Sequence, residues 1–304
     1  MNFKNLPQLL NYFENEKTCV EYFEKQRWGN TIACPHCGNV EKIYRTDRGY
    51  KCSACLKKFT VKVGTIFEDS KISLRIWFAA IYICSAHKKG ISSLQLSRDL
   101  NITQKTAWFV LHRVRAMLKA EAPFMVDTVY QADETFIGGK NKNRHADKKI
   151  LESQGRSVKD KTPVLGMVKQ SKGTVITRVI PDTKVSTLKP IILELVKEGS
   201  TIVTDEWNSY NSIRDKYNHV VIKHKDGEYV RGAFHTNSVE GFWAILKRGI
   251  YGIYHYASRQ HLHAYCNEFA YRHNSRKITD IERFDRVLTH TEGRLTYKKL
   301  TGKI

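Results

Sequence analysis

Two close pairs of cysteines constrain the fold of this chain more than any other feature. Cys34-Pro-His-Cys37 precedes Cys52-Ser-Ala-Cys55, and 14 residues separate the inner cysteines. Four thiolates in two such knuckles can close a tetrahedron around Zn²⁺, and a segment this short cannot bury enough apolar surface to fold alone. We therefore predict a structural zinc site. A redox-active pair is the alternative, but a thioredoxin-like motif would not come doubled.

The charge of the chain indicates an anionic partner. Its 51 Lys and Arg residues outnumber its 30 Asp and Glu residues, which gives a formal net charge of +21. Residues 1–120 carry +11 of that charge and the remainder carries +10. Basicity spread over the whole chain predicts a long polyanion that crosses several modules, whereas a merely basic soluble protein is the simpler alternative.

Composition and the N-terminus indicate a folded cytoplasmic protein. Hydrophobic residues make up 41% of the chain and aromatic residues 11%, which is not a disordered composition. No run of about 18 apolar residues is present, so we expect no membrane span. The N-terminus lacks a basic-then-apolar signal pattern, and seven cysteines, an odd number, argue against a disulfide framework.

The order of predicted elements divides the chain into modules. We predict an N-terminal helical segment at 1–30, a zinc ribbon at 31–65, three helices within 70–120 and a basic C-terminal tail at 281–304. Between them, over 125–280, we predict strands at 129–137, 163–169, 173–180, 201–205 and 219–223, with helices at 186–198, 234–248 and 259–275. Three strands without intervening helices, followed by alternating helices and strands, form a mixed α/β order. This order fits the ribonuclease-H-like plan and not a regular doubly wound sheet.

The spacing of capping and apolar residues over 90–115 is typical of a helix-turn-helix. Ser92 or Ser93 can cap a first helix, Thr103 can cap a second, and Asn101 suits the turn. Leu94 and Leu100 are expected to face inward. The groove-facing side of the second helix would then carry the candidate DNA-contact residues Gln104, Lys105, Thr106, Trp108 and Arg113. A plain packing unit is the alternative, but the basic flanks favour DNA binding.

Three carboxylates stand where a mixed sheet presents functional groups. Asp133 interrupts an apolar strand, Asp205 ends another, and Glu240 lies in a helix. Each carboxylate alone is weak evidence of a functional site, because an aspartate at a strand end is often a turn residue. Together they predict a site for two Mg²⁺ or Mn²⁺ ions, which could align a phosphodiester for in-line attack.

Two neighbours of Glu240 share its helix face by their spacing. Asn237 could assist the metal, and Lys247 could hold a phosphate. A solvated surface lysine is the alternative for Lys247. On the strand, Glu134 is expected to point to the face opposite Asp133, and Trp243 is expected in the core.

Three long motifs resemble one known family. They are ADETFIGG at 132–139, TDEWNSY at 204–210 and HTNSVEGFWAILKR at 235–248. These motifs, with the cysteine ribbon before them, are similar to those of zinc-ribbon insertion-sequence transposases related to Merlin elements. The resemblance implies a ribonuclease-H-like domain whose Asp-Asp-Glu triad falls on Asp133, Asp205 and Glu240.

The resemblance also implies a function. A transposase of a bacterial insertion sequence would bind terminal inverted repeats, cleave DNA with Mg²⁺ or Mn²⁺ and join the ends to target DNA. Two ends must be handled together, so we expect a homodimer or a higher oligomer on DNA, located at the nucleoid. Three alternatives stay open at this point: a DNA-binding regulator, a repair or ribonuclease enzyme of the same fold, and a zinc-dependent interaction module.

Overall fold

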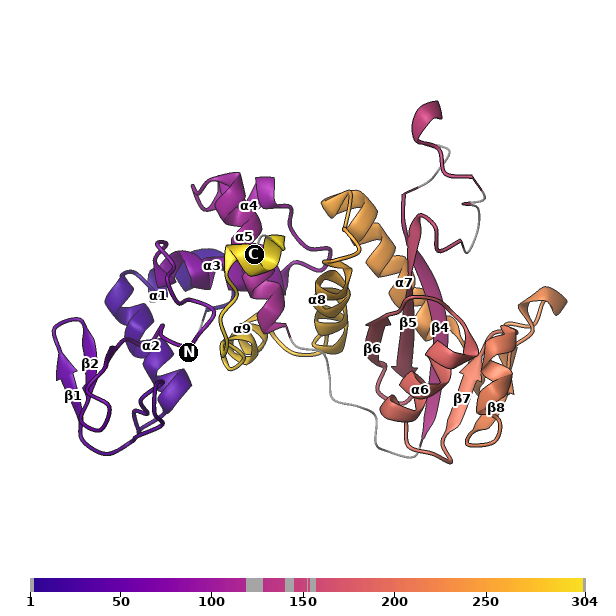
Figure 1. Ribbon diagram of the computed structural model, residues 1–304, viewed down its shortest axis with the longest axis horizontal. Coiled ribbons are helices and arrows are strands. Elements are labelled where there is room, and N and C mark those ends of the chain that lie inside the picture. Colours follow the sequence, from indigo (N-terminus) through magenta and orange to yellow (C-terminus); the bar gives the residue numbers. More distant parts are fainter. Residues whose placement is uncertain (1–2, 119–127, 140–144, 152, 154–156, 303–304) are drawn as a thin grey trace. The chain divides into compact units, whose positions relative to one another are not determined.

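The computed structural model of the chain describes residues 3–118, 128–139, 145–151, 153 and 157–302. Two units emerge (Figure 1). One contains residues 1–119 together with 277–304, and the other contains residues 120–276. The boundary that the sequence predicts between 120 and 125 lies outside the described residues.

The first unit begins with two helices and a small sheet. Helices α1 (Leu6–Tyr12) and α2 (Glu16–Trp28) start at asparagine caps, whose side chains accept hydrogen bonds from backbone amides of the first turn. An antiparallel sheet follows, composed of β1 (Ile43–Thr46), β2 (Gly49–Cys52) and β3 (Lys58–Phe59). Its apolar cluster is small, and a cluster of this size contributes little folding free energy by itself.

Three helices occupy the predicted helical region: α3 (Leu74–Ala86), α4 (Ser93–Asp99) and α5 (Gln104–Met117). Ser92 caps α4, Thr103 caps α5, and Asn101 adopts φ 51° in the turn between them, a conformation that asparagine tolerates. The expectation for Leu94 is wrong, because it is 50% exposed and Leu96 is buried instead. None of the helices in the described ranges is long and apolar enough to span a membrane.

The C-terminal segment, predicted as a basic tail, contains two helices. It forms α9 (Asp280–Leu288) and α10 (Tyr297–Thr301). Phe284 of α9 is fully buried, and its ring packs 5.5 Å from that of Phe78 in α3. The hydroxyl of Tyr22 donates to Asp285. Apolar residues at helical spacing on α9 therefore complete the core of the first unit.

The second unit is built on a five-stranded sheet with the order β6-β5-β4-β7-β8. The strands are β4 (Val129–Gly138), β5 (Lys161–Lys169), β6 (Thr174–Val179), β7 (Thr201–Thr204) and β8 (Asn218–Val221). The first three form the expected antiparallel meander, β7 then pairs in parallel with β4, and β8 pairs in parallel with β7. Smaller elements are β9 (Val230–Arg231), β10 (Phe234–His235), a π-helix (Ile250–Tyr254) and short 3₁₀ turns at Ala146–Lys148, Asn208–Ile213 and His224–Asp226.

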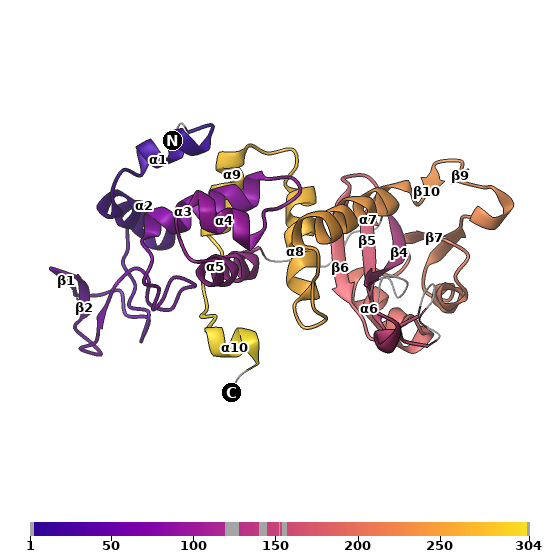
Figure 2. The ribbon, with the colours of Figure 1, turned by 90° about the horizontal axis from the view of Figure 1, so that it is seen from above.

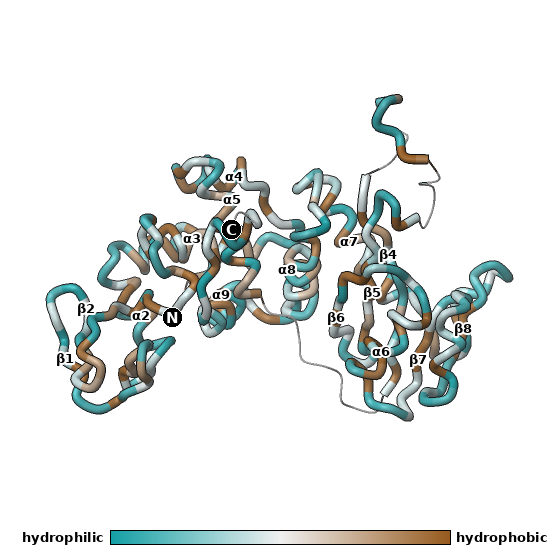
Figure 3. The backbone as a smooth tube through the Cα atoms, in the orientation of Figure 1, coloured by the Kyte–Doolittle hydropathy of each residue, from teal (hydrophilic) through white to brown (hydrophobic). Residues whose placement is uncertain are grey.

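Helices cover both faces of this sheet (Figure 2). Helix α6 (Val185–Leu195) packs on one face, against Tyr130 and Ala132 of β4. Helices α7 (Asn237–Gly249) and α8 (Leu262–Asn274) cover the other face. Figure 3 shows the hydrophobic colouring in the sheet strands and in α6, which is the pattern of a sheet buried on both sides.

Candidate functional site

The four cysteines of the ribbon lie close together. Their Sγ atoms are all within 4.8 Å of one another, and the pairs Cys34–Cys55 and Cys37–Cys52 are each 3.7 Å apart. Tetrahedral Zn²⁺ with Zn–S bonds of about 2.3 Å requires sulfur–sulfur distances of about 3.8 Å, whereas a disulfide requires about 2.0 Å. The cluster therefore fits a structural zinc ion.

Asp133 lies in the middle of β4, on the face that α7 covers. Its partner in β5 is Gly166, where an added Cβ would lie 2.4 Å from Cζ2 of Trp243. The glycine thus leaves room for the indole, whose Nε1 donates to Asp133 Oδ2 at 3.0 Å. Burial first, and then the negative charges of Asp205 and Glu240, raise the pKa of Asp133 to about 6. Ionisation of Asp133 therefore lowers the free energy of unfolding of the second unit.

Asp205 follows the last residue of β7, next to Asp133 in the sheet. Strands β4 and β7 are parallel with Gln131 opposite Val203, so the two aspartates stand two residues further along neighbouring strands. Asp205 Oδ1 accepts from the backbone amide of Trp207 at 3.0 Å, which holds the carboxylate in a turn. The shared register places the two carboxylates next to each other at the carboxyl end of β7.

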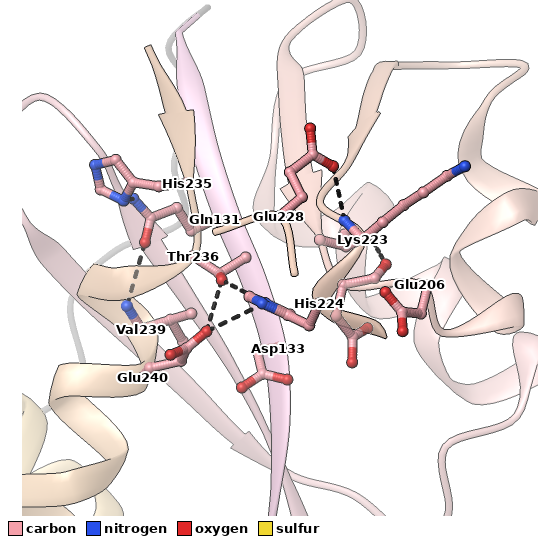
Figure 4. A network of polar contacts seen from close by, with 12 residues as sticks. Gln131, Asp133, Glu206, Lys223, His224, Glu228, His235, Thr236, Val239 and Glu240 are labelled. Atoms are coloured by element: carbon pink, nitrogen blue, oxygen red, sulfur yellow. Dashed lines mark hydrogen bonds and ion pairs between the residues drawn. The ribbon is translucent and has the colours of Figure 1, made fainter. Parts of the chain in front are cut away.

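Glu240 lies in the first turn of α7 and is held by two side chains. Its Oε1 accepts from Thr236 Oγ1 at 2.7 Å and lies 3.4 Å from His224 Nε2. Figure 4 shows this group beside Asp133. Among the described residues, the four cysteines are the one group of three or more His, Cys, Asp or Glu side chains placed closely enough to hold a metal ion. The oxygens of the three carboxylates share a site but do not form an equally tight set.

The buried side chain of Gln131 ties β4 to α7. Its Oε1 accepts from the backbone amides of Ser238 at 3.1 Å and Val239 at 3.2 Å. These amides lie at the start of α7, where the side chain of the N-cap residue Thr236 accepts no hydrogen bond from a backbone amide of the helix. The Val239 amide also donates to the carbonyl of Thr236 at 3.1 Å. One fully buried amide on the strand of Asp133 therefore caps the helix of Glu240.

The exposed stripe of α7 carries the predicted accessory residues. Asn237 and Glu240 are exposed and Lys247 is partly exposed, whereas the opposite stripe of the helix is buried. Burial lowers the pKa of Lys247, and the negative charge of Asp133 opposes that shift. Lys247 therefore lies within electrostatic reach of the carboxylates.

The neighbouring glutamates have other environments. Glu134 is buried and lies next to Tyr210 on the α6 side of the sheet, where burial and the charge of Glu134 raise the pKa of the phenol well above its usual range. Glu206 accepts from the backbone amide of Lys225 at 3.2 Å. The alternation along β4 thus turns Asp133, and not Glu134, toward Glu240.

The predicted DNA-contact residues of α5 divide into an exposed and a buried set. Gln104 and Lys105 are exposed and Thr106 is partly exposed. Arg113 is only 5% exposed, and its Nε donates to Leu295 O at 3.0 Å. The expectation that Arg113 faces a DNA groove is therefore wrong, because the C-terminal segment covers that flank of α5.

Two family models match the chain. An ISXO2-like transposase domain matches residues 126–274, and a transposase zinc-ribbon domain matches residues 14–58. A transposase-like protein of Haemophilus influenzae is 30% identical over 108 residues, which cover 35% of this chain and 86% of that protein. The chain belongs to the ISXO2-like transposase family.

A second relative is similar over most of the chain. A protein in transposable element ISH50 of Halobacterium salinarum is 29% identical over 250 residues, covering 78% of this chain and 83% of that protein. A solved structure titled as a simian T-cell lymphotropic virus intasome with PP2A regulatory subunit B56 gamma matches 61% of this chain and 66% of that chain. Its identity is 13% and its TM-score 0.30, which supports no conclusion. The two matched ranges contain the four cysteines and the three carboxylates.

Several residues of the transposase site escaped the sequence patterns. Gln131 carried a usable signal, since it is a polar residue two positions before Asp133 on the same face of an apolar strand. Trp243 was expected in the core, where it lies, but its indole also holds Asp133. His224 carried no signal, because only the fold brings its 3₁₀ turn to α7.

Proposed function

We propose that this transposase cuts DNA at the ends of its insertion sequence and joins the freed 3′-hydroxyl groups to target DNA. Asp133, Asp205 and Glu240 are the proposed catalytic carboxylates. The observation that carries the proposal is the parallel register that aligns Asp133 with Asp205, beside a helix that brings Glu240. The strand order β6-β5-β4-β7-β8 supports assigning the second unit to the ribonuclease-H-like plan.

The donor set suits Mg²⁺ or Mn²⁺. Carboxylate oxygens are the ligands that these ions prefer, and a partly buried group of mutually repelling carboxylates gains most from a cation. Two bound ions would activate the attacking oxygen and stabilise the leaving oxygen. Asp133, Asp205 and Glu240 would hold them.

Other residues of the chain would orient these ligands and the DNA. Trp243 fixes one oxygen of Asp133, and the backbone of Trp207 fixes one oxygen of Asp205. Lys247 is the proposed phosphate ligand, since its ammonium group interacts with the charge of Asp133. Asn237, exposed at the start of α7, is the proposed accessory ligand.

Recognition of the DNA ends is assigned to the first unit. The zinc ribbon and a helix-turn-helix made of α4 and α5 would bind the terminal inverted repeats as double-stranded DNA, with Gln104, Lys105 and Thr106 nearest the bases. Two ends require at least two protomers on DNA. The motif similarity supports a relation to Merlin elements, and the DNA substrate implies a cytoplasmic location at the nucleoid.

A cleavage assay tests this function. Purified protein is incubated with Mg²⁺ and a labelled duplex taken from the end of its own insertion sequence. Asp205→Asn should reduce cleavage at the repeat end at least about 100-fold, because a metal ligand contributes several kcal/mol to the transition state. Asp215→Asn is the matched control, since Asp215 is an exposed aspartate paired with Lys189.

Each outcome of the assay has a distinct meaning. Equal cleavage by both variants would overturn the assignment of the triad. Tight binding of the repeat without cleavage by the wild type would favour a DNA-binding regulator. If unlabelled random DNA competes for cleavage as well as unlabelled repeat DNA does, a repair or ribonuclease enzyme would be favoured.

A further inference from the structure

The C-terminal segment contacts one flank of the helix that the proposed function assigns to DNA, and the packing of the first unit buries much of the rest of that helix. His112, Arg113, Arg115 and Met117 of α5 are buried. The exposed polar side chains of α5 lie in its first turn, at Gln104 and Lys105. A recognition surface on α5 alone would therefore be short and would carry a single exposed lysine.

The path of this segment across the first unit is well defined. Backbone amides of Ile66 and Gly293 donate to the carbonyls of Thr291 and Gly64 at 2.8 and 3.0 Å. Beyond this pairing, the carbonyl of Leu295 accepts from Arg113. The chain is thereby guided along α5 toward the start of that helix.

Helix α10 then packs on the exposed end of α5 (Figure 2). The ring of Tyr297 lies 5.5 Å from that of Phe109 and 6.2 Å from that of Trp108. The ammonium group of Lys105 lies 5.1 Å from the centre of the Tyr297 ring. Leu300 is buried, so α10 is anchored at both of its turns.

The next two residues after Tyr297 are lysines, and both are exposed. Lys298 and Lys299 therefore extend the positive surface that begins at Lys105. Three lysines on adjoining elements suit a run of phosphates better than a single base contact, because lysine acts as a mobile point charge.

We infer that α10 is part of the DNA-binding surface and that Lys298 and Lys299 contact the phosphate backbone beside the segment read by α5. The inference rests on the proposed function, since it takes the repeat duplex as the ligand. The aromatic contact of Tyr297 sets the position of the lysines.

Salt-dependent binding tests the role of α10. Affinity for the repeat duplex is measured with the full-length protein between about 50 and about 200 mM salt. Loss of two phosphate contacts in Lys298→Gln/Lys299→Gln should reduce the slope of log affinity against log salt concentration by about 2. Lys197→Gln/Lys216→Gln removes the same charge from exposed positions before β7 and β8, at the ends of these strands opposite to Asp205, and should leave the slope at the wild-type value.

A second pair of variants examines the aromatic anchor. Tyr297→Ala should weaken binding and lower the slope, whereas Tyr297→Phe, which keeps the ring, should bind as the wild type does. Equal slopes for the two lysine pairs would overturn the inference. Tighter binding by Tyr297→Ala would also overturn it, because α10 would then mask α5 and not extend it. If the wild type cuts the repeat ends but the slopes are equal, only this inference fails, and if the wild type does not cut, the proposed function fails.

Discussion

At the scale of single residues, the site combines burial with like charge. Asp133 stands in an apolar strand beside Asp205, and burial first, and then the charge of Asp205, raise the pKa of Asp133 to about 6. The indole of Trp243 and the space left by Gly166 hold the group in place but do not neutralise it. Buried charges that lower stability are common at functional sites, where function and stability conflict.

Removal of that charge should stabilise the second unit. The folded-state pKa of Asp133 is raised from 3.8 to about 6, so its ionisation penalty is absent below pH 4, grows as the pH rises through 6 and is constant above. Asp133→Asn keeps an acceptor for Trp243 and should increase the free energy of unfolding by about 1 to 3 kcal/mol above pH 6.

Thermal unfolding at pH 5 and pH 7.5, with the ribbon zinc retained and no Mg²⁺ added, measures this effect. The gain of Asp133→Asn over the wild type should be larger at pH 7.5, while repeat cleavage is lost. A gain that is equal at both pH values, or a loss of stability at pH 7.5, would contradict the assigned environment of Asp133.

At the scale of elements, the site depends on one cap that reaches from a strand to a helix. Helix α7 has no side-chain cap from its own N-cap residue, and Gln131 of β4 supplies the acceptor instead. The same strand carries Asp133 and the same helix carries Glu240. The cap therefore sets how β4 and α7 meet at the carboxylates.

Variants of Gln131 should separate metal binding from stability. Gln131→Met removes the acceptor of the Ser238 amide, whereas the Val239 amide keeps the carbonyl of Thr236. The loss should destabilise the unit by about 1 to 3 kcal/mol. It should also raise the Mg²⁺ concentration for half-maximal cleavage by about 10- to 100-fold, as loss of supporting groups does at metal sites. Gln131→Glu keeps the acceptor oxygen and should restore most of the metal affinity.

A core variant of similar cost serves as the control. Ile192→Val trims a buried side chain on the opposite face of the sheet and should cost about 0.5 to 1.5 kcal/mol without changing the Mg²⁺ requirement. If both variants shift the Mg²⁺ requirement equally, Gln131 has no positioning role.

At the scale of the whole molecule, the two units carry different sets of groups for binding metal. The first unit holds four cysteine thiols in a ribbon with a small apolar cluster, and α9, from the end of the sequence, packs on α3 in the same unit. The second unit holds the three proposed carboxylate ligands on a sheet buried on both faces. The folding of the ribbon should therefore depend on metal, and that of the sheet should not.

Zinc removal tests this difference. A chelator should abolish hydrogen-exchange protection in β2 and β3, because binding of zinc supplies the folding free energy of such a ribbon. Protection in β5 should remain, and affinity for the repeat should fall at least about tenfold. Cys52→Ser should act in the same way. Loss of protection in β5 at the same chelator concentration would show that the sheet also depends on zinc.

Local patterns alone determined much of this protein. Cysteine spacing identified the ribbon, and hydrophobic periodicity located the strands and helices of the second unit to within a few residues of β4 to β8 and α6 to α8. Those patterns work because they report covalent reach and which face of an element is apolar. Helix α9 also has a local signal, a capping box from Thr279 to Glu282.

Only the tertiary structure decided which side chains meet. Arg113 follows the expected spacing of a recognition helix but is buried, because a segment 182 residues away packs on it. Leu94 and Leu96 are equally apolar, and the helix packing alone selects the one that is buried. Gln131 and His224 reach α7 only through the sheet and its connections. Spacing along the chain carries no information about such contacts, because they depend on how distant segments pack.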